Sequence, residues 1–408
     1  MMQFKIALLN VIRNYRRSLI TLVAIQFGVA SLIIFGGYIS AMHEGHREGI
    51  IHSQLGHIQI YKKGFNDYGS SEPEAYLLSP ELQNKVQTAV DSIQQVVLAT
   101  PRLNFSGLIT NGRHSIAVVG AGIDADKEAM LSSSINIIKG ESLFPENTSG
   151  GLLGAGLVKA LNVNVGDYLT LLASTSDGAM NAVDVELTGV LSTGVRDLDN
   201  ILIRLNLNHV QDLMYTQDVT RLVLMLDETE HTQPVLKQLE KIFTDQELDL
   251  ELKTWDELAM LYNEVVAMYD SIFFFIKLIV LFIVALSISN TMLMSVMERT
   301  NEIGTIRAIG ATRSGVVFMV MTEAGILGVI GCLAGIATGY ILAETITALQ
   351  FMMPTPPGAT QTYPVRVFFE TGIILETAAL GLVMAVVSSI YPAVKASRLQ
   401  ITQALRFA

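Results

Sequence analysis

Four histidines lie close together in the sequence, and their spacing is the first pattern that could support chemistry. They are His43, His46, His52 and His57. His43 and His46 are one helical turn apart, so their imidazole groups could bind the same metal ion. The local sequence "HEGHREG", however, differs from the H-E-x-x-H pattern of zinc hydrolases. We therefore interpret this segment as a solvated helix and expect no metal ion there.

Motifs for nucleotide binding and for catalysis are the next features to consider. The nearest approach to a phosphate loop, "GVLSTGVR" at residues 189–196, lacks the lysine of the G-x-x-x-x-G-K-[ST] pattern. The sequence contains neither a G-x-S-x-G nucleophile elbow nor a D-x-[DN]-x-[DN]-G calcium loop. We therefore expect a chain that is not itself an enzyme and that binds no cofactor of its own.

The charged residues are few and unevenly distributed. They make up 16% of the chain, against about a quarter in an average soluble protein. Residues 41–270 hold 32 acidic and 15 basic residues, whereas the rest holds 6 acidic and 12 basic residues. An acidic block is thus inserted into a basic, apolar frame. Because the block would repel phosphate groups, we expect no nucleic acid partner.

Four long apolar runs predict membrane-spanning helices. They cover residues 19–40, 271–294, 315–343 and 371–394. The first run has 22 residues, which make about 33 Å of helix, enough to cross the apolar core of a bilayer. A cleaved secretion signal is the alternative for this run, but its apolar part would be too long.

The basic flanks of these runs predict the orientation in the membrane. Lysine and arginine gather in residues 1–18, 295–314 and 395–408. These three segments fall on the same side if every run crosses, and short basic segments mark the cytoplasmic side. The acidic block 41–270 and the loop 344–370 then lie outside. We expect a multi-pass membrane protein with a large domain on the outer side.

The outer block predicts a mixed α/β domain. Strand-like patterns occur in "GHIQIYKK", "HSIAVVGAGI", "VDVELTGVL", "NILIRL" and "RLVLMLD", and helical spacing in "PELQNKVQTAVDSIQQV" and "TQPVLKQLEKIF". The stretch "TWDELAMLYNEVVAMYDSIFFFIK" predicts a helix that runs unbroken into the second span. In the third span, Gly331, Gly335 and Gly339 form G-x-x-x-G pairs, which favour close packing between helices.

A short charged segment, "MERTNEIGTIRAIGATRSG" at residues 297–315, separates the second and third spans. Ile303, Ile306 and Ile309 recur every three residues, while Glu302 and Arg307 fall elsewhere around the predicted helix. An amphipathic helix of this kind lies on the lipid surface or docks into a groove of a cytoplasmic protein. Spacing alone leaves both interpretations open.

This segment resembles the coupling helix of the FtsX-like permeases, which include MacB and the LolC/LolE-type lipoprotein-release proteins. Glu323 in the next span also fits the family pattern. The matching residues are Glu298, Arg299, Glu302, Ile303, Gly304, Arg307, Ala308, Gly310 and Ala311.

Two other parts of the sequence carry the same resemblance. In the outer block, "GAGLVKALNVNVGDYLTLLA" is similar to a family segment with a Gly-Asp turn, here Gly166 and Asp167. The tail resembles the ending of the family at Pro392, Ala393, Ala396, Ser397, Arg398, Ala404, Leu405 and Arg406.

The resemblance implies an α-helical protein of the bacterial inner membrane with four transmembrane helices and a large mixed α/β periplasmic domain between helices 1 and 2. It also implies two subdomains in the outer domain, the inserted one near residues 105–150. Such a chain is the permease of a mechanotransmission-type ABC transporter, paired with a second copy or a paralogue. A cytoplasmic ATPase dimer would bind ATP and Mg²⁺ and contact Glu298, Arg299, Glu302, Ile303, Gly304, Ile306, Arg307, Ile309 and Gly310.

The lipoprotein-release relatives further imply that the first span faces membrane lipids and a lipid-like cargo. The residues concerned are Val23, Gln26, Phe27, Ala30 and Ile34. We therefore expect lipoprotein release, with a periplasmic carrier or adaptor as a further partner. Within the family, the alternatives are export of peptides or small molecules and activation of cell-wall hydrolases. A membrane-anchored ligand sensor is the alternative from another class, and it would need more cytoplasmic chain than residues 395–408 supply.

Overall fold

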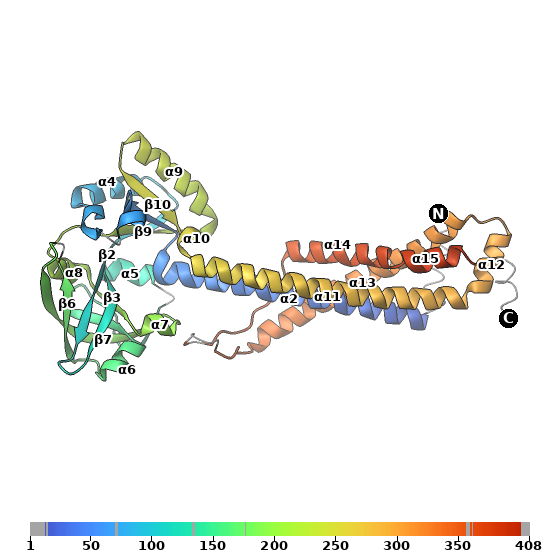
Figure 1. Ribbon diagram of the computed structural model, residues 1–408, viewed down its shortest axis with the longest axis horizontal. Helices are drawn as coiled ribbons and strands as arrows, with labels where there is room; N and C mark the ends of the chain where they lie inside the picture. The colour runs from blue at the N-terminus through green and yellow to red at the C-terminus, as the bar shows by residue number, and fades with distance from the viewer. Residues whose placement is uncertain are drawn as a thin grey trace. The chain divides into compact units, whose positions relative to one another are not determined.

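The computed structural model describes residues 13, 15–69, 72–132, 135–175, 177–355, 360 and 362–400. These residues form two compact units (Figure 1). The helical unit comprises Met1–Glu44, Val265–Met353 and Pro364–Ala408, and the α/β unit comprises Gly45–Glu264 and Pro354–Tyr363. Much of the predicted cytoplasmic segment 1–18 and the tail matches at Ala404, Leu405 and Arg406 lie outside the described residues.

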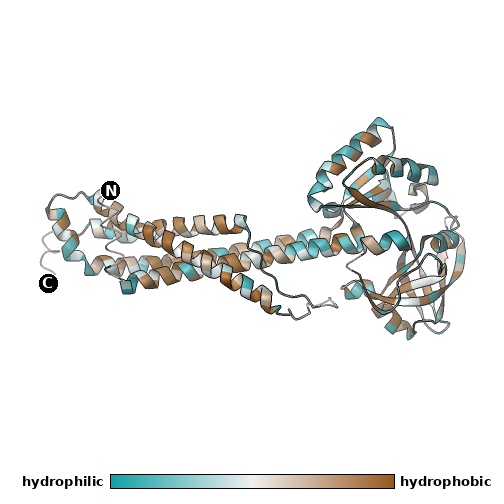
Figure 2. Cartoon of the chain, turned by 180° about the vertical axis from the view of Figure 1, so that it is seen from behind, coloured by the Kyte–Doolittle hydropathy of each residue, from teal (hydrophilic) through white to brown (hydrophobic). Residues whose placement is uncertain are grey.

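Six of the helices that the structure describes belong wholly or largely to the helical unit. They are α2 (Tyr15–Ile50), α11 (Met260–Glu298), α12 (Thr300–Ala308), α13 (Arg313–Leu349), α14 (Thr371–Ser388) and α15 (Ile390–Ser397). Within the described residues, four stretches are long and apolar enough to cross a membrane, namely Tyr15–Leu55, Met260–Glu298, Arg313–Leu349 and Thr371–Ser397. This confirms the four predicted spans, and Figure 2 shows hydrophobic residues along much of these helices.

Glycines let α13 pack closely against α2, as their spacing predicts. A side-chain carbon added at Gly335 would lie 2.7 Å from Cβ of Val29, a separation that real side chains do not adopt. The row continues in register, with Gly331 against Ile25 and Gly339 against Ile33. The branched side chains of α2 thus fill the space that the missing side chains leave, which is how helices associate where no water drives burial.

An added methyl group should therefore act differently at two positions of α13. Gly335→Ala should destabilise the protein, because about 1–3 kcal/mol of overpacking exceeds the gain of about 1 kcal/mol in helix propensity. Gly325→Ala is the matched control, since its added carbon would meet only Val386, at 4.0 Å. Thermal unfolding in detergent should give a lower midpoint for G335A than for G325A. Equal midpoints would contradict the close packing of α2 and α13.

In the described part of the chain, the α/β unit is built on ten strands. They are β1 (Ile58–Lys62), β2 (Val96–Thr110), β3 (Ser115–Ile123), β4 (Asn136–Gly140), β5 (Gly150–Gly154), β6 (Tyr168–Ser174), β7 (Met180–Ser192), β8 (Leu202–Asn206), β9 (Arg221–Leu226) and β10 (Leu250–Thr254). The helices and helical turns are η1 (Ile51–Leu55), α3 (Phe65–Tyr68), η2 (Pro73–Tyr76), α4 (Pro80–Asp91), α5 (Ala125–Leu131), α6 (Ala155–Leu161), α7 (Arg196–Asp199), α8 (Leu207–Met214), η3 (Thr229–His231), α9 (Thr232–Asp245) and α10 (Trp255–Leu258). The predicted mixed α/β fold is confirmed.

Two long strands, β2 and β7, organise the sheet. The pairings β2–β3–β8–β5–β7–β6 return to β2 and so close a ring of six strands. Aliphatic side chains that include Leu103, Leu171 and Leu205 fill one core. The strands β10, β1, β9 and the start of β2 share a second core with α4 and α9. The first core extends well beyond the predicted subdomain limit at residue 150, because β7 and β8 complete the ring.

The predicted unbroken helix from Trp255 into the second span is wrong, since Ala259 separates α10 from α11. The side chain of Asn263 donates a hydrogen bond of 2.7 Å to the carbonyl of Asp256. That carbonyl would otherwise accept the next bond of a continuous helix, and a side chain that takes its place produces a kink. The backbone of Trp255 also bonds to His57 next to β1, which holds α10 against the sheet.

Candidate functional site

The charged segment between the second and third spans forms α12 and two tight turns. Arg299 (φ −98°, ψ 18°) separates the end of α11 from α12. Gly310 follows α12 with a φ of +110°, a left-handed conformation that favours glycine. Thr312 then caps α13 by accepting a hydrogen bond of 3.1 Å from the backbone of Gly315. The sequence thus encodes a short helix with defined ends.

A chain of ion pairs holds α12 to its neighbours in the helical unit. Arg299 lies 3.0 Å from Glu302 and 3.0 Å from Glu323, which is only 5% exposed within α13. Glu302 also pairs with Arg13, at 2.6 Å. Near the same end, Arg17 of α2 pairs with Glu298 of α11. These contacts connect the starts of α2 and α13 with both sides of the turn at Arg299.

The electrostatic balance at Glu302 follows from these contacts. Burial alone would raise the pKa of this carboxyl group, but hydrogen bonds from Arg299 and Arg13 outweigh it and lower the pKa. Glu302 is therefore ionised at neutral pH. Because its side chain is 45% exposed, solvent screens these pairs, and their main effect is to orient α12.

Removal of Arg299 should be costly because it leaves the buried Glu323 without its counter-charge. We expect Arg299→Met to lower the free energy of unfolding by about 3–5 kcal/mol. The double variant Arg299→Met/Glu323→Leu should be markedly more stable than R299M, since both charges are then gone. Unfolding in detergent micelles measures the difference. A double variant as unstable as R299M would show that the pair does not balance a buried charge.

The three isoleucines of the predicted docking face do not share one environment. Ile303 is only 2% exposed and packs in a cluster with Val296, Val316, Val320, Ala393 and Ala396. It is therefore a core residue of this end of the helical unit and offers no surface to a partner. Ile306 and Ile309 are 37% and 83% exposed. These two side chains are the apolar surface that α12 presents.

The other predicted coupling residues divide in the same way. Gly304 is buried, and Glu298 and Gly310 are exposed. Arg307 is half-buried and donates a hydrogen bond to the carbonyl of Leu399, just beyond α15. Some of the residues predicted to dock to a partner therefore hold α12 to its neighbours in the helical unit, and the others are exposed.

The residues predicted to face cargo lie on different sides of α2. Val23 and Phe27 are exposed, at 38% and 65%. Gln26 donates a hydrogen bond of 2.6 Å to the Thr338 hydroxyl on α13, as a lone amide in an apolar helix requires. Ile34 is half-buried, and Ala30 is buried with its Cα 3.6 Å from the carbon position at Gly339. Ala30 therefore contacts α13 rather than the surface.

One ion pair between two of the spans was not predicted from the sequence. Lys277 of α11 lies 2.5 Å from Glu376 of α14 and also contacts the ring of Phe273, 4.8 Å from its centroid. A lysine within an apolar run is expected to reach the interface or a partner helix. A lone glutamate in the fourth apolar run was the available signal for its partner.

The four clustered histidines do not form a metal site in the described part of the chain, where no three His, Cys, Asp or Glu side chains could hold a metal ion together. His57 is buried between β9 and η3. Its Nδ1 accepts a hydrogen bond from the backbone of Leu226, and its Nε2 lies 3.1 Å from the Thr229 hydroxyl. Burial and the neighbouring His52 lower the pKa of His57 to about 4. His57 is therefore a neutral structural residue at neutral pH.

This low pKa predicts a loss of stability in acid. The unfolded chain binds a proton at His57 near pH 6.5, whereas the folded chain binds it near pH 4, so stability falls as the pH drops between these values. The contribution is about 3 kcal/mol. His57→Asn keeps an acceptor for Leu226 and should remove this component from the pH dependence of unfolding. The same change at the exposed His114 should leave it intact, and an unaltered pH dependence in H57N would refute the assignment.

The fold and the site together define a class of protein. Four apolar spans, a large α/β unit inserted between the first two, and a short amphipathic helix between the second and third are typical of membrane permeases that a partner drives. Residues 18–242 match the MacB-like periplasmic core domain, and residues 274–401 match the C-terminal part of the FtsX-like permeases. The chain belongs to the FtsX-like permeases with a MacB-like periplasmic core domain.

Similar proteins have related names. The lipoprotein-releasing system transmembrane protein LolC of Xylella fastidiosa is 25% identical over 77% of this chain and 78% of its own. The corresponding LolE of Haemophilus influenzae is 24% identical over 94% of this chain and 92% of its own. The ABC transporter permease YknZ of Bacillus subtilis, itself uncharacterised, is 23% identical over 99% of this chain and 98% of its own.

Family membership has three consequences. The chain is an ABC transporter permease subunit and does not catalyse a reaction itself. It is a multi-pass membrane protein, and its α/β unit is a large periplasmic domain. An ABC permease also implies a partner ATPase.

Proposed function

We propose that this permease serves lipoprotein release, in which a cytoplasmic ATPase dimer drives a lipid-modified cargo out of the bacterial inner membrane. The observation that carries the proposal is the similarity to LolE, which extends over 94% of the chain and so includes every unit of the fold. The similarity to LolC over 77% of the chain supports it further. Cargo would pass to a periplasmic carrier or adaptor. The ATPase, and not this chain, would bind ATP and Mg²⁺.

The exposed surface of α12 supports a docking role for this helix. Ile306 and Ile309 form the apolar part. Glu302 is four residues before Ile306, so its exposed carboxylate lies on the same side of the helix, contrary to the expectation that it falls elsewhere. A short helix with apolar anchors suits a hydrophobic groove on a partner protein. The ion pair of Arg299 with Glu323 would then pass a push on α12 to α13, and the pair of Glu302 with Arg13 would pass it to the segment just before α2.

The exposed apolar faces of the spans support a working unit of two permeases. Only 17% of the most apolar stretch of α11 is buried within the chain, whereas 56% of the corresponding stretch of α13 is buried. Aromatic and aliphatic side chains cover its free side, namely Phe274, Phe275, Leu278, Ile279, Phe282, Ile283 and Leu286. Val23 and Phe27 of α2 add a second free surface. A second copy or a paralogue facing these surfaces would enclose a path lined by apolar side chains, suited to acyl chains.

Charge placed on the docking surface should uncouple the permease from its ATPase. Ile309→Glu and Ile306→Glu should each reduce permease-stimulated ATP hydrolysis at least about tenfold, because burial of a carboxylate in an apolar groove costs several kcal/mol. Asn301→Glu is the matched control, since Asn301 is exposed on the same helix but on the other side from Ile306. It should retain stimulation, and equal losses in all three variants would argue against docking at the isoleucines.

The cargo is tested by purification of the complete permease–ATPase complex, followed by mass spectrometry of the molecules that co-purify. Acylated proteins are expected, together with their ATP-dependent release from proteoliposomes to a soluble carrier. Release of unmodified peptides or small molecules instead would favour export. Stimulation of a cell-wall hydrolase without any transported cargo would favour the activator role, and either result would overturn lipoprotein release.

A further inference from the structure

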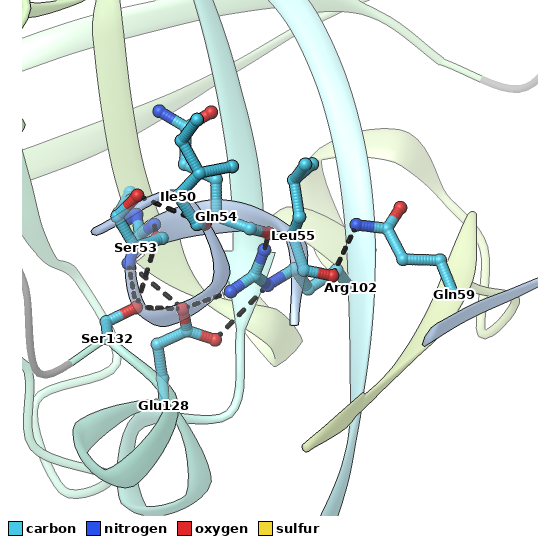
Figure 3. A network of polar contacts seen from close by, with 9 residues as sticks. Ile50, Ser53, Gln54, Leu55, Gln59, Arg102, Glu128 and Ser132 are labelled. Atoms are coloured by element: carbon cyan, nitrogen blue, oxygen red, sulfur yellow. Dashed lines mark hydrogen bonds and ion pairs between the residues drawn. The ribbon is translucent and has the colours of Figure 1, made fainter. Parts of the chain in front are cut away.

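A cluster of buried charges lies where η1 meets the sheet (Figure 3). Arg102 comes from β2, Arg204 from β8 and Glu128 from α5, and their exposed fractions are 2%, 6% and 3%. Arg102 binds Glu128 in a bidentate manner, with Nε 3.2 Å from Oε2. Arg204 Nη1 lies 3.0 Å from Oε1 of the same carboxylate. Two guanidinium groups therefore share one counter-ion.

The remaining donors of the two arginines point to the backbone of η1. Arg204 Nη2 donates a hydrogen bond of 2.8 Å to the carbonyl of Ser53. Arg102 Nη1 donates to the carbonyl of Gln54, which Figure 3 shows beside it. The buried amide of Gln59 takes the next carbonyl, that of Leu55, at 2.7 Å. Three successive carbonyl groups at the end of a helix thus find side-chain partners.

These carbonyl groups supply the negative charge that the cluster otherwise lacks. The last carbonyls of a helix have no partner within the helix and carry a partial negative charge. Here the helix is the continuous stretch Tyr15–Leu55 of 41 residues, which includes the first membrane span. Burial and Glu128 act in opposite directions on Arg204, and burial lowers its pKa to about 10, so the group remains charged at neutral pH. Burial would raise the pKa of Glu128, but the two arginines lower it.

The end of this helix is also held by close packing. Gly56 terminates η1 with a φ of +62°, and its backbone N–H bonds to the carbonyl of Ile51. An added side-chain carbon at Gly56 would lie 2.5 Å from Val223 and 2.8 Å from the carbonyl of Leu224 on β9. Only glycine satisfies both the left-handed turn and this close approach.

We propose that Arg102 and Arg204 form a clasp that fixes the periplasmic end of the first membrane helix to the sheet, so that the two respond to force as one body. Glu128 orients both arginines. The second membrane helix reaches the sheet less directly, since the break at Ala259 separates α11 from α10, and it is α10 whose backbone bonds to His57. The clasp makes the first membrane helix the principal carrier of movement to the periplasmic domain. This role rests on the proposed function, but the clasp itself does not.

The physical basis is the cost of opening the clasp. Withdrawal of η1 would leave two buried guanidinium groups with one carboxylate and would expose three carbonyls without partners. The loss of a hydrogen bond that involves a charged group costs more free energy than the loss of a hydrogen bond between neutral groups. Arg102 and Arg204 are thus positioning residues that act through the helix they hold.

The experiment compares the hydrogen exchange of the full-length chain in lipid nanodiscs with that of three arginine variants. Arg102→Lys and Arg204→Lys keep the charge but lose the forked geometry, so they cannot bind Glu128 and a carbonyl together. Arg221→Lys is the matched control. Arg221 is the cross-strand partner of Arg102 on β9, and it hydrogen-bonds Tyr61.

Amides of residues 52–56 should exchange about tenfold faster in R102K and R204K, and within about twofold of wild type in R221K. Ser132→Ala removes a hydroxyl that bonds both Glu128 and Arg204 and should give a smaller increase in the same segment. It serves as the milder variant if the lysine variants do not fold. Unchanged exchange in R102K, R204K and S132A, or equal acceleration in R221K, would overturn the clasp.

A second measurement separates positioning from simple stabilisation. With the partner ATPase bound, ATP should alter the exchange of β2 and β9 in the wild type, and this change should fall by about half or more in R204K. ATP hydrolysis itself should stay within about twofold of wild type, because Arg204 is in the periplasmic domain. An undiminished ATP response in R204K, with loosened η1, would contradict the carrier role and leave the lipoprotein proposal untouched.

Discussion

Charged side chains that are removed from water must keep a counter-charge. This constraint determines how several helices and strands of the described structure are connected. In the helical unit, Arg299 accompanies Glu323 into apolar surroundings, and Lys277 is paired with Glu376. In the periplasmic domain, Glu128 and the end of a helix balance Arg102 and Arg204. Unpaired, any of these groups would cost several kcal/mol. The two members of each pair lie on different elements. Because the charges must stay paired, these elements are held together.

Such fixed connections matter in a permease that depends on a partner ATPase. A force applied at α12 reaches other elements only through contacts that do not yield. Ion pairs and the core around Ile303 make α12 part of the helical unit rather than a loose loop. The glycine row between α13 and α2 adds close packing along the spans. Continuity of the helix from Tyr15 to Leu55 then carries the first span directly into the clasp.

Much of the fold could be predicted from the sequence, because long apolar runs and basic flanks are strong local signals. The G-x-x-x-G pairs predicted close packing in the third span, and β3 and β9 were visible as strands. The break at Ala259 was not, because it depends on a side-chain bond from Asn263 to Asp256 that no periodicity reveals. The strand ring also escaped prediction, since closure depends on pairing between segments far apart in the chain.

The proposed coupling segment around α12 illustrates the same limit. Its residues were recognisable, and α12 lies within the predicted segment, but spacing alone could not separate Ile303 from Ile306 and Ile309. Only the packing of α13 and α15 against α12 shows which isoleucine is enclosed. Arg102, Glu128 and Arg204 gave no signal, because they are 26 and 76 residues apart from one another and meet only in the folded domain.

The proposed coupling requires α12 to offer its exposed isoleucines to an ATPase in the cytoplasm. Thiol labelling of Ile309→Cys tests it most directly, in a chain whose one native cysteine, Cys332, is replaced by alanine. A membrane-impermeant maleimide should label inverted membrane vesicles but not intact spheroplasts, and bound ATPase should protect the site. Labelling of spheroplasts, or labelling of vesicles that the ATPase does not prevent, would contradict the account.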